Sequence, residues 1–408
     1  MTRRLYTMAL MVLGLSMLLS STGCHEPTSR DPRVLRVGVI VSLKGPARYW
    51  GVVTMRSAQV VADYYNERGG FEVAGERVKI ELVVLDDEFD ATEANRVAHQ
   101  LVSEGIHYTI GPLGDATVDA ARRVLEGANV FYLHYGFDPA LQGSGGLAVL
   151  GMPRPEQTLS IMFRHLRQEH HVSRAVVMAY GTEAGIRQKR VAEQLALDAG
   201  MELVRIARYD VSKETFDVSL DPQGIQRRVA GVVAAAPDLV VLAGCPPEAF
   251  VVIVDRLRSA GYRGFVGTQT TQDPRALAKL GEASDGIYYV GGEPADALRS
   301  EYFRTLKERY LDLAGEWDAE ANKKFYALEL IVSCIRAAGL EALDETSLIY
   351  PVLSELNIED PFYQEPRALR LIGGQEEGLP RQLEIPIYIT KMSGGRAVLV
   401  EESPRVLP

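Results

Sequence analysis

The feature that most constrains the fold is a regular alternation of apolar, β-type segments with amphipathic, helix-type segments from residue 34 onward. In the first part of the chain the expected strands are 35–43, 77–85, 107–110 and 130–135, with helices around 58–65, 94–101 and 116–126. Residues 35–43 form a β-branched run, which is typical of a strand buried on both faces, whereas 77–85 starts as an alternating strand and ends in an apolar run. The alternation predicts a parallel sheet with helices on both sides.

The same alternation of strand-type and helix-type segments begins again and predicts a second lobe. The expected helices are 156–168, 186–199, 223–236 and 247–260, and the expected strands are 174–179, 202–207, 239–243, 264–267 and 287–290. Helical stretches follow at about 298–314 and 319–338, and β-like segments at 367–372, 383–391 and 397–401. The predicted fold class is α/β, with two doubly wound, Rossmann-like lobes. Parallel sheets bind ligands beyond the carboxyl ends of their strands, so two facing edges predict a cleft for a small molecule.

Residues 1–23 differ in kind from the rest of the chain and predict an export signal. Arg3 and Arg4 form a short basic head, residues 5–19 are mostly apolar, and small residues follow up to Cys24. This arrangement is typical of a secretory signal. The alternative is a membrane-spanning anchor, but the apolar run is shorter than the roughly 18–20 residues that a bilayer requires.

The end of this segment, Thr22-Gly23-Cys24, resembles a bacterial lipobox, in which the cysteine is lipidated and becomes the first residue of the mature chain. Ser21 departs from that pattern, since such signals usually have leucine three places before the cysteine. Residues 24–34 are polar and contain proline, which predicts a tether. We therefore expect an exported lipoprotein, anchored to a membrane through Cys24 and facing the periplasm or the cell exterior.

Charge and cysteine content exclude several classes of protein. The formal net charge is −10 at pH 7, and it is −12 without residues 1–23, which contain two arginines and no acid. Such a surface repels phosphate backbones, so nucleic acid is not an expected partner. Cys245 and Cys334 lie in apolar segments and predict buried free thiols, although the sequence leaves a disulfide between them open.

Several short motifs occur in a fixed order over about a hundred residues. They are Val37-Gly38-Val39-Ile40, Gly45-Pro46, Tyr49-Trp50-Gly51, Asn66-Glu67-Arg68-Gly69-Gly70-Phe71, Ile80-Glu81-Leu82-Val83 with Asp86-Asp87, and Ile110-Gly111-Pro112-Leu113. In this order and spacing they resemble the leucine/isoleucine/valine-binding family of substrate-binding proteins of ABC importers. That family has the type I periplasmic-binding-protein fold, and its members close around a ligand and deliver it to a membrane permease.

The resemblance implies two lobes joined by a hinge that the chain crosses three times. Mapped on this sequence, lobe one would be 35–153 plus 291–383, and lobe two would be 154–290 plus 384–408. It also implies a role for Trp50, which stands where many members carry an aromatic residue that packs on the ligand. Trp50 lies between Gly45-Pro46 and Gly51, so we expect it in a loop at the site, the alternative being a core tryptophan.

Asp115 marks the clearest departure from the family. In amino-acid-binding members a serine at this position and the following helix N-terminus hold the ligand α-carboxylate. Asp115 is either a ligand contact or the N-cap of the helix, accepting from the N–H of Thr117 or Val118. Either role places a carboxylate where the ligand carboxylate would bind, so an α-amino acid held in the usual way is disfavoured.

The next contact loop also departs from the family, whose members commonly have Ala-Thr or Ser-Thr there. Here it reads Tyr135-Gly136-Phe137-Asp138-Pro139. Tyr135 and Phe137 could form an aromatic wall, and Asp138 could pair with a cationic group. The alternative is a turn in which Asp138 is simply the residue before Pro139.

In the second lobe the resemblance sets Tyr180 against a family tyrosine, with an ambiguous gap placement, and Gln269 at the place of a glutamate that neutralises the ligand amine. Glutamine keeps the hydrogen bonding but supplies no charge. We therefore expect a small polar ligand that is neutral or cationic, with an apolar part against the aromatic residues.

No catalytic or metal-binding arrangement is recognised. His165, His170 and His171 lack a carboxylate or cysteine at known ligand spacing, so we expect no metal, and neither a dinucleotide motif nor a nucleophile elbow is present. The leading hypothesis is a monomeric, non-enzymatic solute-binding protein of an ABC importer, without a cofactor, that works with a permease. The alternatives are a protein of the same fold that presents its ligand to a sensor, and a secreted α/β enzyme.

Overall fold

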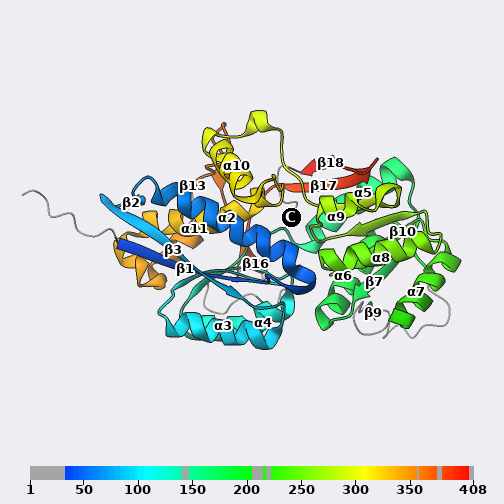
Figure 1. Ribbon diagram of the computed structural model, residues 1–408, viewed down its shortest axis with the longest axis horizontal. Helices are drawn as coiled ribbons and strands as arrows, with labels where there is room; N and C mark the ends of the chain where they lie inside the picture. The colour runs from blue at the N-terminus through cyan, green and yellow to red at the C-terminus, as the bar shows by residue number, and fades with distance from the viewer. Residues whose placement is uncertain are drawn as a thin grey trace, which may run out of the picture.

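The computed structural model describes residues 33–403, except 139–140, 142–146, 205–214, 217–221, 356–357 and 375–378, and it has two lobes that lie side by side (Figure 1). The expected signal at 1–23 and the expected lipidation site Cys24 lie outside the described residues. Arg33 and Val34, which we placed at the end of the tether, instead pair with Val78 and Lys79 in the first sheet. The tether prediction of 24–34 is therefore wrong at its last two residues.

The first sheet has the strand order β15-β16-β6-β5-β4-β1-β3-β2. Its strands are β1 (Arg33–Val41), β2 (Phe71–Val73), β3 (Glu76–Asp86), β4 (Tyr108–Leu113), β5 (Phe131–Tyr135), β6 (Ala148–Leu150), β15 (Leu371–Gly374) and β16 (Leu379–Leu383). The strands from β3 to β16 are parallel, while β2 and β15 pair antiparallel at the two edges. All the carboxyl ends of the parallel strands therefore lie along one edge.

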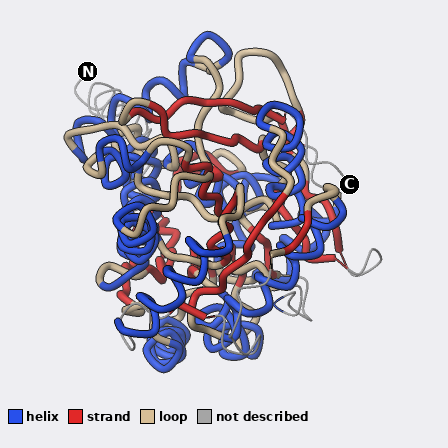
Figure 2. The backbone as a smooth tube through the Cα atoms, turned by 90° about the vertical axis from the view of Figure 1, so that its right-hand side faces the viewer, coloured by secondary structure: helices blue, strands red, loops and turns tan. Residues whose placement is uncertain are grey.

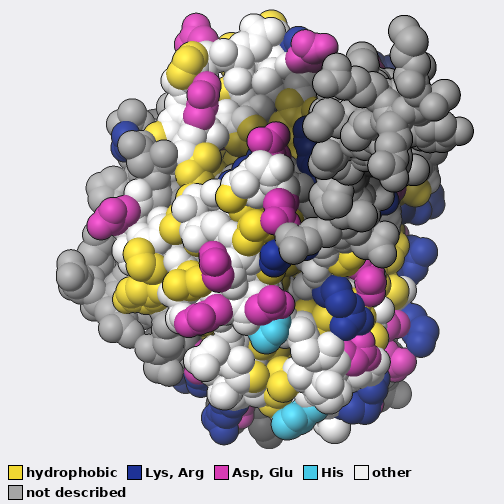
Figure 3. Space-filling model, turned by 90° about the vertical axis from the view of Figure 1, so that its left-hand side faces the viewer, with side chains coloured by type: hydrophobic (Ala, Val, Ile, Leu, Met, Phe, Trp, Pro, Cys, Tyr) yellow, Lys and Arg dark blue, Asp and Glu magenta, His cyan; other side chains and the backbone are white. Residues whose placement is uncertain are grey.

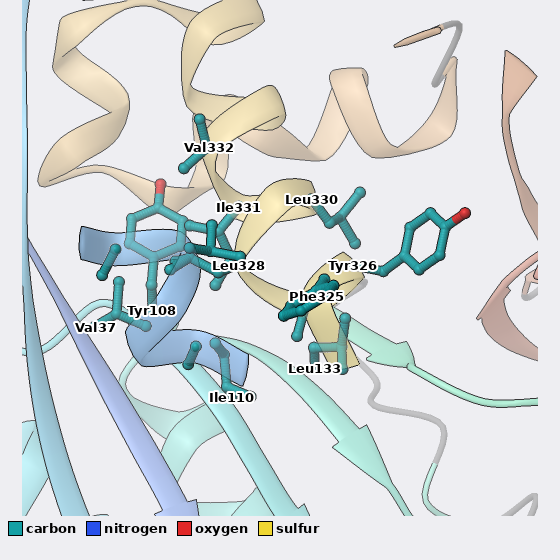
Figure 4. Close-up of a cluster of buried hydrophobic side chains, with 14 of the residues drawn as sticks. Val37, Tyr108, Ile110, Leu133, Phe325, Tyr326, Leu328, Leu330, Ile331 and Val332 are labelled. Carbon is teal, nitrogen blue, oxygen red and sulfur yellow. The ribbon is translucent and has the colours of Figure 1, made fainter. Parts of the chain in front are cut away.

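Helices cover both faces of this sheet, as the sequence predicts. One face carries α2 (Arg48–Asn66), α10 (Glu301–Ala314), α11 (Ala321–Ala338) and α12 (Ile349–Ser354), and the other carries α3 (Ala91–Ser103) and α4 (Asp115–Gly127). Figure 4 shows the core beneath α11, where Phe325, Leu328 and Ile331 face Val37, Ile110 and Leu133 of the strands. Alternate strand residues serve the two faces: Tyr132 belongs to the cluster under α3 and α4.

The second sheet has the order β18-β17-β12-β11-β10-β7-β8, with β9 beside β7. Its strands are β7 (Arg174–Tyr180), β8 (Glu202–Leu203), β9 (Thr215–Phe216), β10 (Leu239–Ala243), β11 (Phe265–Thr268), β12 (Ile287–Val290), β17 (Ile387–Ser393) and β18 (Arg396–Ser403). Helices α5 (Pro155–His170) and α6 (Glu183–Asp198) cover one face, and α7 (Pro222–Ala235), α8 (Pro247–Ser259) and α9 (Pro274–Ala278) cover the other. In the side view of Figure 2 the helices flank the strands of this lobe.

The chain crosses between the two sheets three times, after β6, after β12 and after β16. The small pair β13 (Ile358–Glu359) and β14 (Ala368–Leu369) belongs to neither sheet. The predicted fold class, two doubly wound lobes with a three-crossing hinge, is confirmed, while the division of the chain at residues 153, 290 and 383 stays a prediction.

Charged side chains of both signs are interspersed on the end of lobe one that Figure 3 shows. Charged side chains of this lobe also form exposed ion pairs between neighbouring elements: Arg33–Glu76 and Arg36–Glu81 link β1 to β3. Such exposed pairs contribute about 0–1 kcal/mol each, so the lobe depends on its buried apolar core for stability. Among the described residues, no helix has both the length and the apolar character that crossing a membrane would require.

Helix α2 begins at Arg48, ten residues before the helix that we expected around 58–65, and its first turns lie directly against the end of β1. A Cβ added at Gly51 would lie 2.0 Å from the Ser42 carbonyl oxygen and 2.6 Å from its carbon. These are backbone atoms that cannot rotate away, so only glycine fits at this point of the helix.

We expect Gly51→Ala to destabilise the protein by about 1–3 kcal/mol or more, because α2 must move away from β1. Gly127→Ala is the matched control, since a Cβ at the end of α4 would have no heavy atom within 4 Å. That control should leave stability unchanged or raise it by up to about 1 kcal/mol. Denaturation midpoints measure both changes, and equal midpoints for the two variants would contradict the close contact.

Candidate functional site

A cavity of about 480 Å³ lies between the two lobes, at the carboxyl ends of strands from both sheets. Lobe one contributes residues that follow β1, β3, β4, β5 and β6, together with the start of α11, and lobe two contributes residues at the ends of β7, β10 and β11. The lining includes Trp50, Phe89, Asp115, Thr117, Tyr135, Phe137, Met152, Tyr180, Gln188, Thr271, Glu320 and Lys324. This volume suits a small molecule.

Aromatic side chains form much of the wall on the side of lobe one. Trp50 lies edge-on to Phe89, with ring centroids 6.3 Å apart, and Tyr135 and Phe137 line the same cavity. Trp50 also reaches the second lobe, because its Nε1 donates to the Thr271 carbonyl oxygen at 2.8 Å. We expected Trp50 in a loop, which is wrong: it is the third residue of α2.

Asp115 is buried at the start of α4, but it does not cap that helix. Gly114 is the N-cap residue, so the N-cap alternative for Asp115 is wrong. Its Oδ1 instead accepts from the backbone N–H groups of Phe137 at 2.5 Å and Asp138 at 3.3 Å. Burial raises the pKa of Asp115, and the hydrogen bonds from Phe137 and Gln188 oppose that rise. The carboxylate thus faces the cavity from the helix end and orders the loop after β5.

A chain of three side chains runs from Asp115 into the second lobe. Gln188 Nε2 donates to Asp115 Oδ2 at 3.1 Å, and Gln188 Oε1 accepts from Gln269 Nε2 at 2.6 Å. Gln269 does not itself line the cavity, and its Oε1 is buried without a hydrogen-bond partner. Gln188, which our sequence analysis did not single out, therefore fills the space between Asp115 and Gln269.

Asp138 and Gly136 do not line the cavity. Asp138 pairs with Arg187 Nε of the second lobe at 2.6 Å, so its cationic partner lies within the protein. At Gly136 an added Cβ would lie 2.6 Å from Leu141 Cδ1 and 3.2 Å from Asp115 Oδ1, so this glycine leaves room for the buried carboxylate. Tyr180, the last residue of β7, lines the cavity as we expected of a site residue.

Two adjacent lining residues, Glu88 and Phe89, have left-handed backbones, with φ of 52° and 58°. Carboxylates hold both of them: Asp86 Oδ1 accepts from the Glu88 N–H at 2.9 Å and Asp87 Oδ1 from the Phe89 N–H at 3.0 Å. Non-glycine residues in this conformation are uncommon and are often found at functional sites. The consecutive aspartates Asp86-Asp87 were the sequence signal for this turn, which we did not predict.

Glu320 and Lys324, at the start of α11, were also missed. Lys324 is buried, its Nζ lies 3.6 Å from Glu320 Oε1, and it sits 3.3 Å from the centroid of the Tyr135 ring. Burial lowers the pKa of Lys324 to about 8, and the charge of Glu320 opposes that change. Two consecutive lysines at the start of a helix that continues with a long apolar stretch were the signal that could have found this part of the site.

Within the described part of the chain, no group of three or more His, Cys, Asp or Glu side chains could hold a metal ion. His165 contacts Glu401, and His170 Nε2 contacts the Tyr288 hydroxyl. Cys245 and Cys334 are buried free thiols, one in each lobe.

The sequence pattern of the periplasmic binding protein family matches residues 34–371, most of the chain. The chain belongs to this family. The resemblance to leucine/isoleucine/valine-binding proteins is thereby confirmed, and so is the expectation of a solute-binding protein rather than an enzyme. Periplasmic binding proteins act outside the cytoplasm, which agrees with the expected export.

Individual relatives are distant. The leucine-specific-binding protein of Salmonella typhimurium is 28% identical over 102 residues, which is 25% of this chain and 27% of that protein. The chain spans only about a fifth to a quarter of the length of the curated relatives that it matches. The activity and partners of those relatives are therefore not transferred to this protein by the match alone.

Solved structures establish the fold over nearly the whole chain. A leucine-binding protein from Thermotoga maritima superposes with a TM-score of 0.73 at 16% identity, covering 90% of this chain and 98% of that one. A solute-binding protein of an ABC transporter from R. palustris, in complex with benzoate, gives 0.70 at 16% identity, covering 92% and 98%. At such low identity the likeness concerns the fold alone.

Replacing Gln188 with leucine should favour separation of the lobes. Leucine can neither donate to Asp115 nor accept from Gln269, and each buried polar group left without a partner costs about 1–3 kcal/mol unless it reaches water. We expect a larger radius of gyration in small-angle X-ray scattering.

Gln194→Leu is the matched control, because this residue lies on the same helix but is exposed and bonds only locally to Asp198. If Gln188→Leu scatters like this control, Gln188 does not hold the lobes together.

Proposed function

We propose that this protein is the extracytoplasmic solute-binding component of an ABC importer and delivers a small molecule to a membrane permease. The observation that carries the proposal is the cavity between the two sheets, lined by residues from both lobes. A ligand there contacts both lobes at once, so its binding energy favours the closed arrangement over the open one.

Direct contacts between the lobes would support this closure. Trp50 bonds to Thr271, Asp138 pairs with Arg187, and Arg275 Nη2 pairs with Asp318 Oδ2 at 3.0 Å. These contacts surround the cavity on different elements, so they form together when the lobes meet. A permease that recognises the closed form would thereby distinguish loaded from empty protein.

The proposed ligand is small and polar, neutral or cationic overall, with an apolar part against the aromatic wall. Asp115 supports this preference because its carboxylate occupies the helix end. A ligand carboxylate about 4 Å from it would be repelled by about 1 kcal/mol in water and about 4 kcal/mol at an effective dielectric of about 20. An amine or amide donor at the same place would instead be attracted to Asp115, and the rings favour cations.

Isothermal titration of the purified chain, without residues 1–24, tests this ligand class. We expect amines, amides or net-neutral amino compounds other than α-amino acids to bind, and leucine not to bind at micromolar concentration. Micromolar leucine binding would contradict the expected ligand class. A protein that binds no member of a broad panel of amino acids, amides and amines would contradict the proposed function itself.

Membrane attachment through Cys24 is a separate part of the proposal. In bacterial cells that process lipoproteins, Cys24→Ser should abolish labelling by radioactive palmitate and release the protein from the membrane fraction. Ser21→Leu is the contrasting variant, since it completes the lipobox and should leave labelling intact or increase it. Membrane retention of the Cys24→Ser protein without labelling would show that residues 1–23 act as an uncleaved anchor.

A further inference from the structure

The first turn of α11 carries an unusual concentration of positive charge. Lys323 and Lys324 are both buried there, and that turn contains no acidic residue. A helix N-terminus itself carries partial positive charge, so cations are unfavourable at this end. Two buried ammonium groups therefore lie where the helix favours an anion.

Glu320, just before the helix, does not balance both lysines. Its Oε2 lies 2.9 Å from Lys323 Nζ and accepts from the Thr271 hydroxyl at 3.1 Å, whereas its Oε1 lies 3.6 Å from Lys324 Nζ. The last distance is longer than a hydrogen bond. Nearby, Arg275 pairs with Asp318, Asp273 and Glu316, so those carboxylates already have a cationic partner. Lys324, the lysine that lines the cavity, has its closest carboxylate oxygen beyond hydrogen-bond distance.

Tyr135 supplies an independent observation at the same place. Its ring lies beneath the Lys324 ammonium, and its hydroxyl is buried without a hydrogen-bond partner. The residue is only 4% exposed and lines the cavity. A buried hydroxyl without a partner is costly, so on a residue that lines the cavity it points to an acceptor brought by the ligand.

We infer that Lys324 and the Tyr135 hydroxyl form a subsite for a carboxylate of the transported solute, and that the solute carries its cationic group at the other end, toward Asp115. The inference rests on the proposed function and narrows its ligand class to a net-neutral zwitterion. The bound solute would thus point in the opposite direction to an amino acid whose carboxylate faces the N-terminus of α4.

The two charges of this solute must be separated along its skeleton. Asp115 lies at the start of α4, tied to the loop after β5 and to Gln188, while Lys324 belongs to α11, and the two do not form an ion pair with each other. A skeleton with its amine and carboxylate at opposite ends suits two groups on different elements better than an α-amino acid, whose charged groups share one carbon. The structure therefore favours amino acids with a terminal amine, with the intervening carbons against Trp50 and Phe137.

Calorimetric titration with matched compounds tests the subsite. The probes are γ-aminobutyrate, δ-aminovalerate and para-(aminomethyl)benzoate, each beside its primary amide, which keeps the amine and the skeleton but removes the negative charge. We expect at least one acid to bind more tightly than its amide. Lys324→Met should weaken binding of that acid by roughly 10- to 100-fold, the loss typical of a charged hydrogen bond, and leave the amide nearly unchanged.

Tyr135→Phe is the second variant, because it removes a hydroxyl that has no partner and should not disturb folding. It should weaken binding of the acid by roughly 10- to 100-fold, the loss typical of one hydrogen bond to a charged group. Lys307→Met is the matched control: Lys307 also pairs with carboxylates and lies over an aromatic ring, that of Trp317, but outside the cavity. It should bind all probes like the unaltered protein.

The outcomes separate the two proposals. The subsite would be overturned, and the proposed function left standing, if the amides bound as tightly as their acids. The same conclusion would follow if the ratio of acid affinity to amide affinity were unchanged in both Lys324→Met and Tyr135→Phe. Absence of binding by every acid and every amide, together with the failure of the wider panel, would contradict the proposed function and the subsite with it.

Discussion

The site exists because two parallel sheets present the carboxyl ends of their strands to the same cavity. In a parallel sheet every strand delivers its following loop to one edge, so β3, β4 and β5 place Phe89, Asp115 and Phe137 together although they are far apart in sequence. The second sheet does the same with the residues after β7, β10 and β11. Because helices cover the faces of the sheets, a solute in this cavity meets the strand ends and not the sheet faces.

Polar contacts within this edge are organised by a few buried groups. Asp115 receives two backbone N–H groups from the loop after β5, and Gln188 continues the chain to Gln269 in the other lobe. Elsewhere in the lining Glu320 holds Lys323 and Thr271. The cavity wall thus includes the carboxylates of Asp115 and Glu320, the ammonium of Lys324 and several aromatic side chains, so it is not uniformly apolar.

The architecture could be predicted because burial on both faces makes strands such as β1 and β4 continuous apolar runs. The start of α2 could not be predicted from the sequence, because Gly51 and the bulky Trp50 interrupt its amphipathic pattern. The glycine is required by a close contact with Ser42, which lies outside the helix. Within the site, Trp50, Tyr135 and Phe137 were singled out through the resemblance to the family, and all three line the cavity. The N-cap alternative for Asp115 was wrong because its partner, the N–H of Phe137, is 22 residues away and comes close only in the folded chain. Gln188 and Lys324 lie inside helices, where a polar residue is ordinarily read as solvent-facing.

The two cysteines of the lobes have a consequence for how the protein moves. Cys245 is 1% exposed in the second lobe and Cys334 is fully buried in α11 of the first, and burial raises the pKa of Cys334 to about 12. Neither sulfur is accessible or ionised enough to react with an oxidant while its lobe stays folded. No covalent bond between these residues restrains the hinge, so an oxidising compartment and a reducing one would leave the opening and closing of the lobes equally free.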